Sequence, residues 1–421
     1  MASIVRFAHR RGPMGWTHHA LKVLDRERHR CASTPLLSMA DGMVQPKFGS
    51  NAFAMNGCGG GDGIDLYFKD ESVHQSGSLK HRLARSLFLY KISSGQIREG
   101  TTCIEASSGS TAISEAYFAR LLGLPFIAVV ASTTAKSKLR CIERLGATCV
   151  LVDSADQVYA EAQAIEAKLN QRSGDSFGGH YMDQFTNAER ATDWKGNNNL
   201  AEDILHQMEV ERHPVPSYVV VGAGTGGTAT TLGRFMHYND YDTQICVVDP
   251  ENSVFYDCFR TGDTSLVLGD GDSSIPPEES GIVPKSGHGR SMIEGIGRPR
   301  VEPSFVPSAV DTMIRVPDAA SYAAMHFLND LGISSNMPGA SSGTNLYGSI
   351  VLIDEMRRNG QDGSLVTLIC DRGDRYLDTY YNQEWLRENG FDLEPYLEQI
   401  RNFWETGTLK KVGRSHSVAK H

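Results

Sequence analysis

Strand-like and helix-like segments alternate along most of this chain, and that alternation constrains the fold more than any other feature. From residue 65 onward, short runs rich in Val, Ile and Phe precede longer segments with helical periodicity, as in TTCIEA before STAISEAYFARLL. The alternation resumes with SYVVV at 217–221 and with DTMIRVPD at 311–318. It predicts an α/β fold with largely parallel sheets covered by helices. Ligands bind such sheets beyond the carboxyl ends of the strands, so we expect the chemistry in segments that follow strands.

Composition excludes several classes of partner. The net charge of −9 argues against a nucleic-acid surface, and no apolar run reaches the roughly 18 residues of a membrane helix. The eight cysteines contain no CxxC pair, and residues such as Cys103 and Cys246 lie in apolar strand contexts. That usage predicts reduced thiols in a cytoplasmic protein and no metal site. The basic start, residues 1–16, is either a targeting peptide or an N-terminal arm, and we favour the arm.

A glycine-rich turn lies inside SYVVVGAGTGGTATTLGRF, residues 217–235, between a predicted strand and a predicted helix. A helix that starts at such a turn binds anions through free N–H groups and its dipole. Gly222, Gly224 and Gly227 match the G-x-G-x-x-G of dinucleotide sites, and Asp249 stands where an acid would bind the ribose. The alternatives are the single phosphate of a smaller cofactor and an ordinary tight turn.

A lysine follows a Ser-Gly-Ser turn in SGSLKHR, residues 76–82. The turn places Lys80 at the start of a predicted helix, where the helix dipole disfavours positive charge and lowers the pKa of an amine. Only a neutral amine forms a Schiff base with an aldehyde, so this position favours a nucleophilic lysine. The alternative is a solvated lysine.

Taken together, these stretches resemble the fold-type II pyridoxal phosphate enzymes, the cysteine synthase and cystathionine β-synthase group. KDESVHQSGSLKHR resembles the lysine segment of that group, and HYMDQFTNAERATDW resembles its segment around a cofactor-side glutamine. The stretches SGSLKHRLARSLFLY and YMDQFTNAERATDWKGNNN resemble the L-cysteine desulfhydrase branch of that group in detail. Four further stretches follow the order of the group: STPLL, EASSGSTA at 105–112, GAGTGGT at 222–228 and EGIG at 294–297.

The resemblance implies two α/β lobes and the cofactor pyridoxal 5'-phosphate. It implies that Lys80 holds the cofactor as a Schiff base and later acts as the general base. The residues implied to cradle the phosphate are Gly224, Thr225, Gly226, Gly227 and Thr228. Those implied to contact the substrate are Ser107, Ser108, Gly109, Thr111, Gln184 and Gly295. On this interpretation the turn binds one phosphate, and Asp249 is simply the end of a strand.

The chain departs from the group at two positions near the cofactor. Ser110 stands where the group commonly has an asparagine that bonds the phenolic oxygen of the cofactor. In LICDRGDRYLD, Arg372 stands at the place of a serine near the pyridine nitrogen, with Asp371 beside it. Either Arg372 faces the ring and disfavours protonation of its nitrogen, or it pairs with Asp371 and points away.

The resemblance implies elimination of sulfide from L-cysteine to give pyruvate and ammonia, in a homodimer. The alternatives are a cysteine synthase, which adds sulfide to an activated serine, and a catalytically silent relative. We expect an apolar C-terminal helix to pack on the body or on a partner, and residues 262–292 to be a lid or a surface loop. The expected domains are an N-terminal arm and helix (1–30), a lobe with Lys80 and the carboxylate loop (31–184), a lobe with the phosphate turn (185–385) and a C-terminal helix and tail (386–421).

Overall fold

The chain forms two compact units in the computed structural model. The first unit comprises the described residues of 1–32 and 84–183, and the second comprises those of 33–83 and 184–421. The sequence-based division instead assigns 33–83 to the lobe that ends at residue 184, and that domain division stays a prediction. The described ranges are 14–31, 33–39, 63–154, 157–195, 199–268, 291–410 and 416–420.

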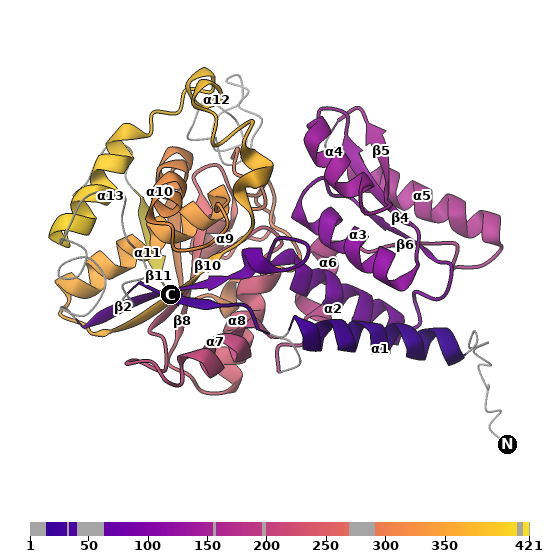
Figure 1. Ribbon diagram of the computed structural model, residues 1–421, viewed down its shortest axis with the longest axis horizontal. Helices are drawn as coiled ribbons and strands as arrows, with labels where there is room; N and C mark the ends of the chain where they lie inside the picture. Colours follow the sequence, from indigo (N-terminus) through magenta and orange to yellow (C-terminus); the bar gives the residue numbers. More distant parts are fainter. Residues whose placement is uncertain are drawn as a thin grey trace. The chain divides into compact units, whose positions relative to one another are not determined.

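A four-stranded parallel sheet, in the order β5-β4-β3-β6, forms the centre of the first unit. Adjacent side chains of a strand point to opposite faces, so Ile104 packs in the cluster of helix α5 (Val158–Ser173), whereas Glu105 contacts Glu115 of helix α3 (Ser110–Leu122). The sheet and its helices are drawn in violet and magenta in Figure 1. The strands are β3 (Thr102–Glu105), β4 (Phe126–Ala131), β5 (Thr148–Val152) and β6 (Gly179–Tyr181).

Three more helices contribute to this unit: α1 (Met14–Arg30), α4 (Lys136–Glu143) and, from Ala84 onward, α2 (Lys80–Ser93). Helix α2 begins in the second unit. Helix α3 ends at Gly123, which takes the left-handed conformation (φ 69°) that glycine adopts without steric cost.

A seven-stranded sheet, in the order β1-β2-β10-β7-β8-β9-β11, forms the centre of the second unit. Its five inner strands are parallel, and the two edge strands pair antiparallel. Two mostly parallel sheets flanked by helices are the α/β architecture that the sequence predicted. The strands are β1 (Leu36–Ser38), β2 (Ile64–Asp70), β7 (Tyr218–Gly222), β8 (Gln244–Pro250), β9 (Thr312–Val316), β10 (Gly363–Ile369) and β11 (Ser417–Lys420).

Helices cover both faces of this sheet (Figure 1). Val220 and Val248 pack in one core cluster with α10, α11 and α13, and Val219 and Val247 pack in the other with α7, α8 and α9. The helices are α6 (Gln184–Ala191), α7 (Leu200–Met208), α8 (Gly227–Tyr238), α9 (Phe255–Thr261), α10 (Asp318–Leu331), α11 (Ala340–Arg358), α12 (Gln383–Glu388) and α13 (Glu394–Thr406). Single 3₁₀ turns are Glu71–Val73, Pro307–Ala309 and Gly373–Tyr376.

The apolar face of α13 packs on α10 and α11 of the same unit. Ile400 and Phe403 are fully buried there, and the rings of Trp404 and Phe327 pack in a tilted arrangement with their centroids 5.2 Å apart. Of the two expected packing partners for this face, the body of the chain therefore buries it.

Two expectations fall largely on residues outside the described ranges, namely those for the basic segment 1–13 and for most of the loop 262–292. Among the described residues, no helix combines the length and the apolar character that a bilayer crossing requires.

Candidate active site

Three neighbouring parallel strands of the second unit, β2, β10 and β7, end at the same edge of the sheet. The chain leaves β2 into the turn before Lys80, leaves β10 into Asp371 and Arg372, and leaves β7 into the glycine turn. The topology thus brings three of the predicted segments to one sheet edge, where open parallel sheets bind ligands.

Lys80 is the first residue of α2, as the sequence predicted. The turn before it lies on the segment after β10, because Leu79 N–H donates to the Cys370 carbonyl (2.8 Å) and Arg372 N–H donates to the Gly77 carbonyl (3.1 Å). Burial lowers the pKa of the Lys80 ammonium group, and the nearby Cys370 and Asp371 offset this in part. The environment therefore shifts the lysine toward its neutral, nucleophilic form.

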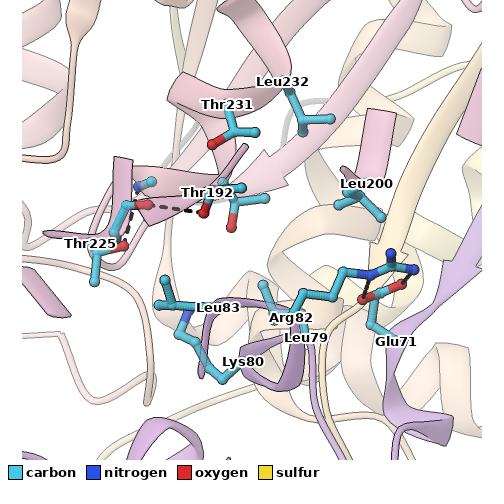
Figure 2. A pocket seen from close by; sticks show the side chains of 13 residues that line it. Glu71, Leu79, Lys80, Arg82, Leu83, Thr192, Leu200, Thr225, Thr231 and Leu232 are labelled. Atoms are coloured by element: carbon cyan, nitrogen blue, oxygen red, sulfur yellow. Dashed lines mark hydrogen bonds and ion pairs between the residues drawn. The ribbon is translucent and has the colours of Figure 1, made fainter. Parts of the chain in front are cut away.

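A buried ion pair braces the first turn of α2. Arg82 Nε and Nη2 donate to the two carboxylate oxygens of Glu71 at 2.7 and 3.0 Å (Figure 2). Arg82 Nη2 also donates to Asp203 at 2.6 Å. Although burial alone raises the pKa of Glu71, Arg82 and His74 hold it well below its usual range. The pair ties the 3₁₀ turn after β2 to the helix that carries Lys80.

The glycine turn after β7 leaves no room for side chains. Gly226 has a φ of 85°, and a Cβ there would lie 2.4 Å from the Phe305 Cα. A Cβ on Gly224 would lie 2.0 Å from the Gly295 carbonyl oxygen, and one on Gly227 would lie 2.7 Å from the Ala188 Cβ. Helix α8 begins directly after this turn, so its first N–H groups have no partner within the helix.

A pocket of about 40 Å³ lies between the lysine turn and helix α8. Figure 2 shows Lys80 on one wall of this pocket and Thr225 and Thr231 on the facing side. Thr225 Oγ1 accepts from Gly227 N–H at 3.1 Å. The buried Thr231 hydroxyl has no hydrogen-bond partner among the described residues, so it offers a polar atom to a ligand.

The 294–297 segment packs directly on the glycine turn through the contact of Gly295 with Gly224. Tyr380 holds it, since Glu294 N–H donates to the Tyr380 oxygen (3.0 Å) and the Tyr380 hydroxyl donates to the Met292 carbonyl (2.7 Å). On the other side of the turn, α6 begins at the buried Gln184 and brings Ala188 against Gly227.

Asp371 and Arg372 each make a hydrogen bond next to the lysine turn. Arg372 Nε donates to the Ser72 carbonyl at 3.0 Å, and Asp371 Oδ2 accepts from the Tyr376 hydroxyl at 2.6 Å. Each contact fixes its side chain beside the lysine turn.

The expected substrate loop belongs to the first unit. It connects β3 to α3, and Ser107 Oγ accepts from Gly109 N–H at 3.3 Å. Gly109 is extended, with φ −106°, and Ser110 and Thr111 open the helix. The loop thus combines small hydroxyl side chains with the first N–H groups of a helix, which suits a carboxylate.

Asp249 is fully buried at the end of β8, where its Oδ2 accepts from Tyr256 N–H at 2.9 Å. Burial raises its pKa to about 7. The carboxyl group therefore binds a backbone N–H at the start of α9, as expected for a residue at the end of a strand.

Sequence reasoning missed the supporting side chains: Glu71, Arg82, Thr231, Tyr376 and Tyr380. Their signal was weak, because a lone charged or aromatic residue shows no period or spacing. Only the position of Arg82, two residues after the lysine, set it apart.

Comparisons with known proteins agree with this geometry. The family model described as "Pyridoxal-phosphate dependent enzyme" matches residues 51–371. The chain is 48% identical over 377 residues to L-cysteine desulfhydrase Cds1 of Mycobacterium tuberculosis, covering 90% of this chain and 91% of that protein. It is 27% identical over 331 residues to a cysteine synthase of Dictyostelium discoideum, covering 79% of this chain and 81% of that protein. The crystal structure of O-ureido-L-serine synthase shares the fold, with a TM-score of 0.62, 21% identity and coverage of 88% of this chain and 95% of that one.

Proposed function

Because the chain belongs to the family of pyridoxal-phosphate dependent enzymes, we propose that it is an L-cysteine desulfhydrase. This enzyme eliminates sulfide from L-cysteine and yields pyruvate and ammonia. The observation that carries the proposal is the 48% identity, over 90% of this chain, to a protein of that name. The lower identity of 27% to a cysteine synthase makes β-replacement the second candidate.

The second unit supplies residues that fit pyridoxal phosphate. Close contacts keep side chains out of the glycine turn, so its backbone can approach a phosphate closely, and Thr225 and Thr228 line the same pocket with their hydroxyls. The buried Thr231 hydroxyl offers one more polar atom at the same pocket. In this proposal Gly224, Gly226 and Gly227 make room for the phosphate.

Lys80 has two roles in the proposal. Its amine would hold the cofactor covalently, and as a free base the same amine would take the proton from the substrate Cα. Burial lowers the pKa of Lys80, which supports both roles, since each needs the neutral amine. When bound, pyridoxal phosphate supplies the electron sink for the carbon that loses this proton.

Asp371 and Arg372 are proposed to border the ring of the cofactor. Asp371 is an electrostatic neighbour of Lys80, and its contact with Tyr376 holds the carboxylate in place. The contact of Arg372 with the Ser72 carbonyl keeps its positive charge beside the lysine turn. The balance of these two charges would set how readily the ring nitrogen is protonated.

Substrate binding is assigned to the 107–111 loop of the first unit and to Gln184 and Gly295 of the second unit. Small hydroxyl groups and the first N–H groups of α3 suit the carboxylate of an amino acid. Ser110 is included as a cofactor contact, in the place of a longer asparagine in related enzymes.

Incubation of the holoenzyme with L-cysteine alone tests this function. We expect sulfide and pyruvate in equal amounts, and neither product from Lys80→Ala. Faster formation of cysteine from O-acetylserine and sulfide would instead favour a synthase. Failure of the purified protein to bind the cofactor would favour a catalytically silent relative.

We further propose that the enzyme is a cytoplasmic homodimer. The free, buried thiols of Cys103, Cys246, Cys258 and Cys370 support a reducing compartment. The dimer rests on the family resemblance, because α13 packs within its own unit. Light scattering of the holoenzyme measures the oligomeric state, and sulfide assays of fractionated cells measure the location.

A further inference from the structure

Two glutamates meet in the interior of the first unit, one just before the 106–109 segment and one in the helix that follows it. Glu105 is the last residue of β3, and Glu115 lies in the second turn of α3. Both side chains are fully buried, and the carboxyl group of Glu105 is the first charged neighbour that faces the carboxyl group of Glu115. The strand that enters the loop and the helix that leaves it are therefore joined by a carboxyl–carboxyl contact.

Such a contact requires a proton, because two ionised carboxylates have no hydrogen to share and repel each other. Glu105 Oε1 accepts from Ala106 N–H at 2.8 Å, which suits the ionised member of the pair. Among the described residues, no backbone N–H, hydroxyl or basic group donates to either Glu115 oxygen, so Glu115 is the member that carries the proton. Burial, with Glu105 second, raises the pKa of Glu115 well above its ordinary value.

The groups around the pair agree with a single proton. Lys91 of α2, itself buried, supplies a positive charge that faces Glu115. From β3, burial keeps the Cys103 thiol neutral by raising its pKa, and from β6 it does the same for Tyr181. Burial and Lys91 lower the pKa of His180 to about 4, so its ring is neutral at neutral pH. The remaining groups that face Tyr181 are Tyr159 of α5 and Asp183.

Charge balance then favours one ionised and one protonated glutamate. One negative charge on the pair compensates the single positive charge of Lys91, whereas two would leave an uncompensated charge in the interior. The pair joins β3, which precedes the loop, to α3, which follows it. Loss of the proton would make the two carboxylates repel each other and would push β3 and α3 apart.

We propose that Glu105 and Glu115 share one proton and thereby hold the 106–110 loop in the geometry that receives the substrate carboxylate. They are positioning residues, with no contact to the reacting atoms assigned to them. All the residues that support the shared proton lie in the first unit. The link to the substrate rests on the function proposed above.

Infrared spectroscopy of the holoenzyme without substrate tests the shared proton. At neutral pH we expect Glu115→Gln to lose part of the absorption of protonated carboxyl groups. Glu99→Gln, an exposed glutamate of the same unit, serves as the matched control and should leave that band unaltered. A band of full intensity in Glu115→Gln would overturn the shared proton, whatever reaction the enzyme catalyses.

Steady-state kinetics with L-cysteine test the positioning role. The amide of Glu115→Gln still donates to Glu105, so we expect KM within about threefold of the wild type. Glu115→Leu removes the shared proton between the two side chains, and we expect KM to rise about tenfold with a smaller change in kcat. The wild-type KM should also rise at alkaline pH more steeply than that of Glu115→Gln, because only the wild type loses the shared proton. Equal KM–pH profiles for wild type and Glu115→Gln would overturn the positioning role.

Discussion

The close contact between Gly224 and Gly295 makes Gly224→Ala the most informative substitution in the second unit. Gly224 lacks the positive φ of Gly226, so alanine meets no backbone penalty there, and only the contact is perturbed. The new Cβ would lie 2.0 Å from the Gly295 carbonyl oxygen, whereas real Cβ atoms essentially never approach within 3.0 Å. The difference, 3.0 − 2.0 Å, means that the glycine turn or the 294–297 segment must move by about 1 Å.

A displacement of about 1 Å at a catalytic site costs on the order of 100-fold in rate. That factor corresponds to about 2.7 kcal/mol of transition-state stabilisation. We therefore expect Gly224→Ala to lose about 100-fold in kcat/KM for L-cysteine and to bind pyridoxal phosphate more weakly. Absorbance titration of the apoenzyme measures the second effect.

Gly233→Ala provides the matched control. A Cβ on Gly233 would lie 1.8 Å from the Ala309 carbonyl oxygen, but this clash occurs six residues into α8, away from the turn. We expect this substitution to lower the free energy of unfolding by about 1–3 kcal/mol and to leave the affinity for the cofactor near the wild-type value. The reasoning is refuted if Gly224→Ala retains full affinity and turnover, or if both variants lose affinity equally.

Three further predictions concern side chains at the ends of β8 and β10. Arg372→Ser removes a fixed positive charge beside the lysine turn and should shift the absorption spectrum of the bound cofactor; an unaltered spectrum would show that the guanidinium does not influence the ring. Tyr376→Phe removes the hydroxyl that donates to Asp371 and should lower the free energy of unfolding by about 1.5–3 kcal/mol, measured by urea titration; a smaller loss would mean that water replaces the hydroxyl. Burial raises the pKa of Asp249 from the ordinary 3.8 to about 7 and so favours the protonated carboxyl in the folded state. Its stabilising contribution is therefore full below about pH 4 and is lost as the pH rises to about 7. The free energy of unfolding of Asp249→Asn should therefore rise relative to that of the wild type by up to about 4 kcal/mol over that range. A difference in unfolding free energy that is independent of pH would contradict this.

Local sequence patterns predicted most of the fold. The buried strand β7 and the helix α8 follow from a run of β-branched residues and a glycine turn, and Lys80 opens α2 as its turn predicted. The edge strand β11 (Ser417–Lys420) was not predicted, because four residues carry too little periodicity and its pairing with β9 is remote in sequence.

The supporting contacts of the site could not be derived from the sequence. Burial of Glu71 with Arg82, or of Glu105 with Glu115, depends on tertiary packing that no periodicity encodes. The packing of residues 33–83 with the second unit is likewise discontinuous in sequence, whereas patterns report only neighbouring residues.

The central claim is that Lys80 holds pyridoxal phosphate covalently, and borohydride reduction followed by peptide mapping tests it most directly. Reduction should bleach the colour of the holoenzyme and leave the pyridoxyl group on the peptide that contains Lys80, and Lys80→Ala should carry no label. A pyridoxyl group on any other lysine, or an unlabelled wild-type enzyme that still releases sulfide from L-cysteine, would contradict the account.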